Sequence, residues 1–79
     1  MRIMIVTAQE IVRCIRRDYG TSIADLQAGA RYCETIARNA SFNPWASPET
    51  APAYSEAANT LKAQAEQRQL DLAAVEAYL

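Results

Sequence analysis

The sequence predicts an all-α protein, a compact bundle of three main helices with a short fourth helix at the C-terminus as an option. Two observations carry this prediction. Apolar residues recur at steps of three and four along three separate stretches, which is the spacing of a helix face. Turn-forming residues are few, because the chain has two glycines and its three prolines all lie between residues 44 and 52. A chain of 79 residues holds one small core, so residues 1–79 are read as a single domain.

The first helix is expected to begin at Ala8 and to end at Tyr19. Thr7 and Glu10 have the spacing of a capping box, in which the Thr hydroxyl accepts a hydrogen bond from the backbone N–H of Glu10. Gly20 can adopt the left-handed conformation that commonly ends a helix. One buried stripe follows the helical spacing, and it consists of Ala8, Ile11, Val12, Ile15 and Tyr19.

The second helix is expected to start after a cap at Thr21 or Ser22, with Asp25 in its first turn. Gly29 inside this helix costs about 1 kcal/mol relative to Ala, so we interpret it as a point where another helix approaches closely. The predicted seam consists of Ile23, Leu26, Ala30, Cys33, Ala37 and Ala40. Arg31, Glu34 and Arg38 are expected to form a solvated row of ion pairs on the outer face.

The third helix is expected to begin between Thr50 and Ala53, because Pro52 lacks the N–H that an earlier start would require. Its stripe consists of Tyr54, Ala58, Leu61, Ala65, Arg68, Leu72, Val75 and Leu79. The sequence allows one helix to the C-terminus, or a break at Leu70 with Asp71 capping a short last helix. We favour the break.

Residues typical of catalytic and metal sites are sparse. The chain has no His, and its glycines, Gly20 and Gly29, do not form a phosphate-binding loop. Cys14 and Cys33 are isolated, which favours buried small hydrophobic residues over a disulfide or a zinc site. We therefore expect a protein that is not an enzyme, with no catalytic residue, no cofactor and no bound metal.

The net charge and the hydropathy of the chain limit which partners and which cellular location are expected. The net charge is −1, from 8 Lys and Arg against 9 Asp and Glu, which provides neither the basic surface of a nonspecific nucleic-acid binder nor the dense negative field of a DNA mimic. The start, MRIMIV, has only four apolar residues in a row, too few for a signal peptide or a membrane span. These features predict a cytoplasmic protein without membrane contact.

The segment 41–54 contains the only Phe, the only Trp and all three prolines of the chain. A connection between two helices needs only about two to eight residues and no Trp, so this segment is interpreted as a rigid contact site. We predict that Phe42 faces the core and that Trp45 is at least partly exposed beside Asn43 and Pro44. The alternative is that Trp45 closes the core.

A second candidate site is the row Arg13, Arg16 and Arg17 on one side of the first helix. With Gly20 in a short turn, the first two helices could form a helix-turn-helix in which these arginines hold phosphates. However, the exposed start of the second helix would carry Asp25, whose carboxylate repels the DNA backbone. Nucleic acid is therefore the less favoured partner.

We expect the chain to run from the initiator Met directly into the first helix, MRIMIVTAQE, and the last helix to end at Leu79, without a tail or a catalytic motif. In size and style it resembles the small accessory proteins of phages and mobile elements, and among these the anti-CRISPR inhibitors. The resemblance implies a phage protein of the host cytoplasm that blocks a bacterial defence complex by occupying a protein surface. Two other functions stay open, a helix-turn-helix-like DNA-binding regulator and a self-associating structural subunit. For the last, the stripe along residues 54–79 predicts association with a second copy or a target.

Overall fold

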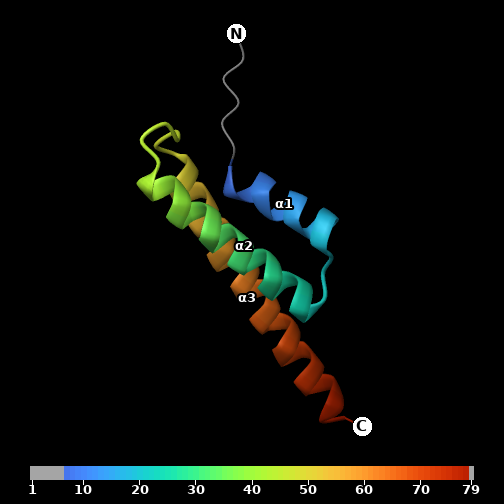
Figure 1. Cartoon of the computed structure of the whole chain (residues 1–79). Coiled ribbons are helices and arrows are strands. Elements are labelled where there is room, and N and C mark those ends of the chain that lie inside the picture. Colours follow the sequence, from blue (N-terminus) through green and yellow to red (C-terminus); the bar gives the residue numbers. More distant parts are fainter. Residues whose placement is uncertain (1–6, 79) are drawn as a thin grey trace.

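The architecture of the protein, taken from a computed structural model that describes residues 7–78, is a bundle of three helices. They are α1 (Ala8–Tyr19), α2 (Ile23–Phe42) and α3 (Thr50–Glu76), and no strand occurs within residues 7–78. Figure 1 shows α2 and α3 side by side and antiparallel, with α1 lying across them. The all-α prediction with three main helices is confirmed.

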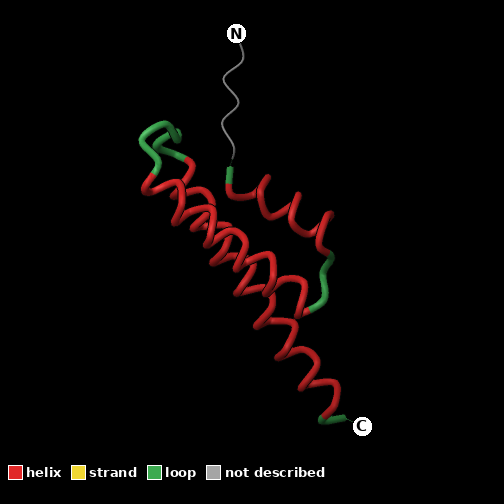
Figure 2. Tube along the Cα trace, viewed as in Figure 1, coloured by secondary structure: helices red, strands yellow, loops and turns green. Residues whose placement is uncertain are grey.

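Two short connections join the helices, as the green segments of Figure 2 show. The first is residues 20–22, where Gly20 has a φ of 110° and its N–H donates to the carbonyl oxygen of Arg16. A left-handed φ of this kind is costly for other residues, which explains the Gly at the end of α1. The second connection is residues 43–49, at the end of the molecule where α2 turns back into α3.

The helix starts follow the predicted caps. The Thr7 hydroxyl oxygen accepts from the Glu10 N–H at 3.2 Å, and the Ser22 hydroxyl oxygen accepts from the Asp25 N–H at 3.1 Å. Ser22, rather than Thr21, is therefore the cap of α2. α3 begins at Thr50, inside the predicted range, although its N-terminal neighbour Glu49 makes no side-chain capping bond.

The Thr7 cap predicts a measurable loss of stability. Thr7→Ala leaves the N–H of Glu10 without its side-chain acceptor and should lower the free energy of unfolding by about 1 kcal/mol. Urea denaturation followed by circular dichroism measures the change. Thr60→Ala is the control, because the Thr60 hydroxyl only donates back to the Glu56 carbonyl within α3. An unchanged midpoint for Thr7→Ala would contradict the capping role.

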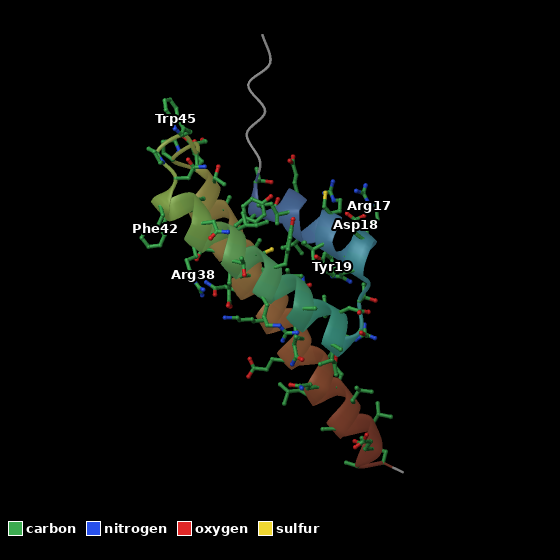
Figure 3. The ribbon with its side chains drawn as sticks, viewed as in Figure 1. Arg17, Asp18, Tyr19, Arg38, Phe42 and Trp45 are labelled. Carbon is green, nitrogen blue, oxygen red and sulfur yellow. The ribbon has the colours of Figure 1, made fainter. Side chains whose placement is uncertain are left out.

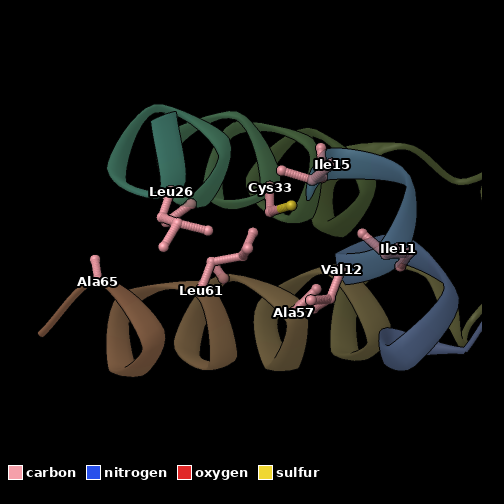
Figure 4. Close-up of a cluster of buried hydrophobic side chains, with 10 residues drawn as sticks. Ile11, Val12, Ile15, Leu26, Cys33, Ala57, Leu61 and Ala65 are labelled. Carbon is pink, nitrogen blue, oxygen red and sulfur yellow. The ribbon is translucent and has the colours of Figure 1, made fainter. Parts of the chain in front are cut away.

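The core lies where the three helices meet. Figure 4 shows Ile15 of α1 directed toward α2 and Val12 of α1 beside Ala57 of α3. The buried residues are Ile11, Val12 and Ile15 from α1, Leu26, Ala30 and Cys33 from α2, and Ala57, Ala58, Leu61 and Ala65 from α3. All six residues of the predicted seam on α2 are buried or half-buried. In the predicted stripe of α1, Tyr19 is exposed. Alanines on α2 and α3 allow the two helices to approach closely, at the expense of large apolar side chains in the core.

Another helix approaches closely at Gly29, as predicted, and that helix is α1. A methyl group added at Gly29 would overlap the Cγ2 atom of Ile15, and it would lie 3.6 Å from a methyl carbon of Leu61. The glycine therefore leaves the space that the Ile15 side chain occupies. Its helix-propensity cost is offset by the packing of α1 onto α2.

The favoured break near Leu70 is wrong, because α3 runs without interruption from Thr50 to Glu76. Asp71 does not cap a new helix. Its carboxylate instead accepts from the Gln67 side-chain N–H at 2.9 Å, one helical turn earlier. The surrounding Ala, Leu, Gln and Arg residues are good helix formers, and neither Gly nor Pro interrupts them. The single-helix alternative is therefore the observed one.

The compact part of the bundle ends before α3 does. Every residue from 66 to 78 is exposed, and Figure 1 shows this end of α3 extending past α1 and α2. We call residues 66–78 the exposed α3 end. The extension contributes to the elongated shape, with principal extents of 55 × 26 × 16 Å.

The predicted ion-pair row on α2 also differs from the structure. Glu34 is half-buried and forms an ion pair with Lys62 of α3. The pair joins two different helices, so Glu34 lies at the edge of the α2–α3 contact rather than on the outer face beside Arg31 and Arg38.

Candidate protein-binding surfaces

Two exposed aromatic residues lie where α2 ends and the connection to α3 begins. Phe42 is 82% exposed and Trp45 is 92% exposed. Figure 3 shows both side chains pointing away from the helices. The prediction that Trp45 is exposed is confirmed, and the alternative that it closes the core is wrong. The prediction that Phe42 faces the core is also wrong.

The position of Phe42 on its helix explains the error. The buried and half-buried side of α2 includes Cys33, Ala37 and Ala40. Because successive residues of a helix are rotated by about 100°, Phe42 lies about 200° around the helix from Ala40. Its side chain therefore points away from that side.

Local hydrogen bonds hold the segment that presents these rings, which we call the aromatic loop (residues 42–49). The Trp45 N–H donates to the Asn43 side-chain oxygen at 2.9 Å, and the Ala46 N–H donates to the Asn43 carbonyl oxygen at 3.2 Å. The Ser47 hydroxyl donates to the Glu49 carboxylate, which lowers the pKa of that carboxyl group. Pro44 and Pro48 further restrict the backbone. Asn43 thus organises the turn that carries Trp45.

The exposure of the aromatic loop predicts its spectroscopic behaviour. Trp45 is the only Trp, so the emission of the isolated protein should be red-shifted and readily quenched by acrylamide. Phe42→Ala should change the free energy of unfolding, measured in urea, by no more than about 0.5 kcal/mol, which is the ordinary range of surface substitutions. A blue-shifted, protected emission would show that Trp45 is covered, and a large destabilisation by Phe42→Ala would show that its ring is packed.

The arginines of α1 form a separate surface. Arg13, Arg16 and Arg17 are all exposed. Arg16 donates to the Gln64 side-chain oxygen of α3 at 3.3 Å, and Arg17 pairs with its neighbour Asp18 at 3.1 Å. In Figure 3, Arg17 at the end of α1 lies well away from Trp45. The aromatic loop and this end of the arginine row are therefore not one contact site.

The structure adds a groove that the sequence did not predict. It is open, has a volume of about 370 Å³, and is lined by Glu10, Ile11, Cys14, Ile15, Asp18, Tyr19, Tyr32 and Tyr54. The rings of Tyr19 and Tyr32 lie 5.8 Å apart, tilted by 41°. Burial raises the pKa of Tyr54. The signal in the sequence was the presence of tyrosines in all three helices, but their convergence depends on how α1 crosses the other two.

Cys14 lies at this groove and is exposed, so the prediction that both cysteines are buried is wrong. Cys33 is buried in the core, as predicted, and burial raises the pKa of its thiol. A higher thiol pKa lowers the fraction of the reactive thiolate at neutral pH.

The two thiols should therefore react differently. Under native conditions we expect one thiol per chain to react rapidly with a soluble disulfide reagent and the second to react only after unfolding. Cys14→Ser should abolish the fast phase, whereas Cys33→Ala should retain it. Two fast thiols in the native protein would contradict the burial of Cys33, and none would contradict the exposure of Cys14.

The exposed α3 end carries a third apolar surface. Leu70, Leu72, Val75 and Tyr78 are all more than half exposed there. Leu72 and Val75, together with Arg68 and Asp71, line a shallow depression of about 260 Å³. The sequence stripe thus continues past the last buried residue of α3, Ala65, without a helix to cover it.

No helix within residues 7–78 has the length and apolar character needed to cross a bilayer. The same residues contain no cluster of three or more potential metal ligands among His, Cys, Asp and Glu. No protein-family model, characterised protein or solved structure matches the chain.

Proposed function

We propose that this chain is a non-enzymatic inhibitor that binds a protein surface. One observation carries the proposal. Five of the buried side chains are Ile, Val or Leu, whereas eight large hydrophobic side chains are exposed within residues 7–78. Isolated apolar residues on a surface are ordinary, but groups of them at defined places are typical of interaction sites.

The aromatic loop is the proposed anchor. An exposed Trp held by a hydrogen-bonded turn loses little conformational entropy when it enters a pocket. Trp is also the residue type most enriched among positions that dominate binding energy. Asn43 and Pro44 would contact the rim of the pocket while Trp45 fills its centre. Arg13, Arg16 and Arg17 would contact a second surface of the same partner.

A bacterial defence complex is the proposed target, and a CRISPR-Cas complex in particular. Within this class, a net charge of −1 argues against imitation of DNA, because such imitation needs a dense negative field. The proposed mechanism is therefore steric, with the inhibitor covering a protein surface that the complex needs for activity. The target is a protein of the bacterial cytoplasm, where a phage-encoded inhibitor would act.

Phage plating tests the function. The chain is expressed in bacteria that carry defined CRISPR-Cas systems with a spacer against the challenging phage. Inhibition should restore plating on one of these hosts. Trp45→Ala should abolish the restoration, and Tyr78→Ala, which removes an equally exposed aromatic ring at the other end of the molecule, should not. Expression levels and circular dichroism must match for all three proteins. Failure of the wild-type chain to restore plating on any host would reject the proposed target.

The alternative of a DNA-binding regulator receives less support. Its recognition helix would be α2, whose N-terminal turn holds the half-buried Asp25 close to Gly20. A carboxylate at this position opposes the approach of a phosphate backbone. The alternative predicts a salt-dependent shift of duplex DNA by the purified protein.

A further inference from the structure

We infer that two copies of the chain pair through their exposed α3 ends. The two helices run antiparallel about a two-fold axis at Leu72, with Arg68 of each copy opposite Glu76 of the other. This pairing goes beyond the proposed inhibition and does not depend on it.

The apolar residues of the exposed α3 end indicate that another helix packs against it. Leu72 and Val75 continue the stripe along which α3 buries Ala58, Leu61 and Ala65 inside the bundle. The stripe lies on one side of the helix, since its positions follow steps of three and four. Within the bundle it is covered by α2, and beyond the bundle the equivalent cover is another helix. The exposed α3 end of a second copy has the length and apolar side chains to provide it.

The charges of Arg68 and Glu76 favour a second copy as the occupant, in an antiparallel orientation. Arg68, Leu72 and Glu76 lie at i, i+4 and i+8, so they form one row with a cation at one end and a carboxylate at the other. Arg68 and Glu76 are about 12 Å apart along the axis, at 1.5 Å per residue. An antiparallel copy centred on Leu72 therefore satisfies both ends at once. A parallel copy in register would place Arg on Arg and Glu on Glu.

Neither charge has another ionic partner within residues 7–78. Both side chains are exposed, and the salt bridges of this part of the chain join other residues, Arg17 to Asp18 and Lys62 to Glu34. The nearby Asp71 is already hydrogen-bonded to Gln67 on its own helix. The row is thus available to a second molecule without breaking an ion pair.

The size of the surface limits the strength of the pairing. A stable complex commonly buries about 800 Å² on each partner, and the last three turns of a single helix offer less than this. We therefore expect a weak dimer, with a dissociation constant on the order of 10–100 μM. Pairing at this end leaves the aromatic loop uncovered in both copies, because the loop lies at the opposite end of the α2–α3 pair.

Charge reversal tests the register. Sedimentation from about 5 to 500 μM should show a monomer–dimer equilibrium for the wild type. Arg68→Glu and Glu76→Arg should each weaken it about tenfold, because two exposed ion pairs become repulsive. The double variant, with both changes in one chain, should restore the wild-type constant. A chain that stays monomeric throughout, or a double variant no stronger than the single ones, would overturn the proposal.

Crosslinking tests the position of the two-fold axis. In a Cys14→Ser background, Leu72→Cys should form a disulfide-linked dimer under mild oxidation, since the two introduced thiols meet at the axis. Leu70→Cys is the matched control, because Leu70 is an equally exposed leucine about 200° around the same helix. Equal crosslinking of the two variants, or crosslinking of Leu70→Cys alone, would contradict the assigned face. Circular dichroism confirms that each variant keeps its helical content.

Discussion

Leu61→Ala is expected to be the most damaging single truncation, with a loss of about 2–5 kcal/mol in the free energy of unfolding. Leu61 is fully buried, and Figure 4 shows its side chain pointing from α3 toward Leu26 and Cys33 of α2. A domain of 79 residues has a total stability of about 4–12 kcal/mol. The substitution therefore removes a large share of that stability, because the core contains few other side chains of this size.

A second leucine on the same helix provides the control. Leu72→Ala removes the same atoms from an exposed position and should change the free energy of unfolding of the monomer by less than about 0.5 kcal/mol. Urea denaturation at low protein concentration measures the monomer, so dimerisation does not affect the comparison. Similar losses for the two variants would mean that Leu61 is not buried in the core.

Gly29→Ala should destabilise the protein by up to about 2 kcal/mol, although Ala is the better helix former. The helix propensity gains about 1 kcal/mol, but the added methyl group overlaps Cγ2 of Ile15. Overpacking of a core costs typically 1–3 kcal/mol, and here the β-branched Ile15 cannot move without α1. The measurement is again the urea midpoint.

A double-mutant cycle isolates this contact. Ile15→Ala alone should cost about 2–5 kcal/mol through lost burial. Combined with Gly29→Ala it should cost less than the sum of the single changes, since the new methyl group occupies part of the vacated space. Strict additivity, or a stabilising effect of Gly29→Ala alone, would show that α1 does not approach α2 at this position.

The elements that could be predicted from the sequence depend on local chemistry. The caps at Thr7 and Ser22 and the left-handed Gly20 involve contacts within one turn, so residue type and spacing were sufficient. The stripes were predicted only in part, because Tyr19 of α1 and Arg68, Leu72 and Val75 of α3 are exposed. The close helix contact at Gly29 was also predicted, although it is a long-range contact. A glycine inside a helix is unfavourable, so its presence there indicates that a close neighbour requires it.

Two of the errors arose where residue type was given more weight than position. Cys14 was expected to be buried as a cysteine, yet it lies to one side of the stripe formed by Ile11, Val12 and Ile15. Phe42 was expected to be buried as an aromatic residue, yet it lies away from the buried and half-buried side of α2. In both cases the angular position of the residue on its helix indicates exposure, whereas the typical burial of its residue type does not.

The exposed α3 end could not be predicted from its own pattern. An apolar stripe shows which side of a helix is suited to burial, but coverage depends on the length of the neighbouring helix. α2 has 20 residues and α3 has 27, so the C-terminal part of α3 extends beyond the helix that covers the rest of it. The tyrosine groove is also a property of the assembled helices, since Tyr19, Tyr32 and Tyr54 come from three different elements.

The attachment of α1 has a consequence for how the native state opens. α1 buries only Ile11, Val12 and Ile15, whereas α2 and α3 contact each other along most of α2. A short helix held by three side chains should detach in a partial unfolding that leaves the α2–α3 pair helical. The amide hydrogens of α1 are therefore expected to exchange with solvent deuterium before those around Ala30 and Ala58, at a lower opening free energy. Folding would follow the reverse order, with the α2–α3 hairpin forming the surface onto which α1 docks.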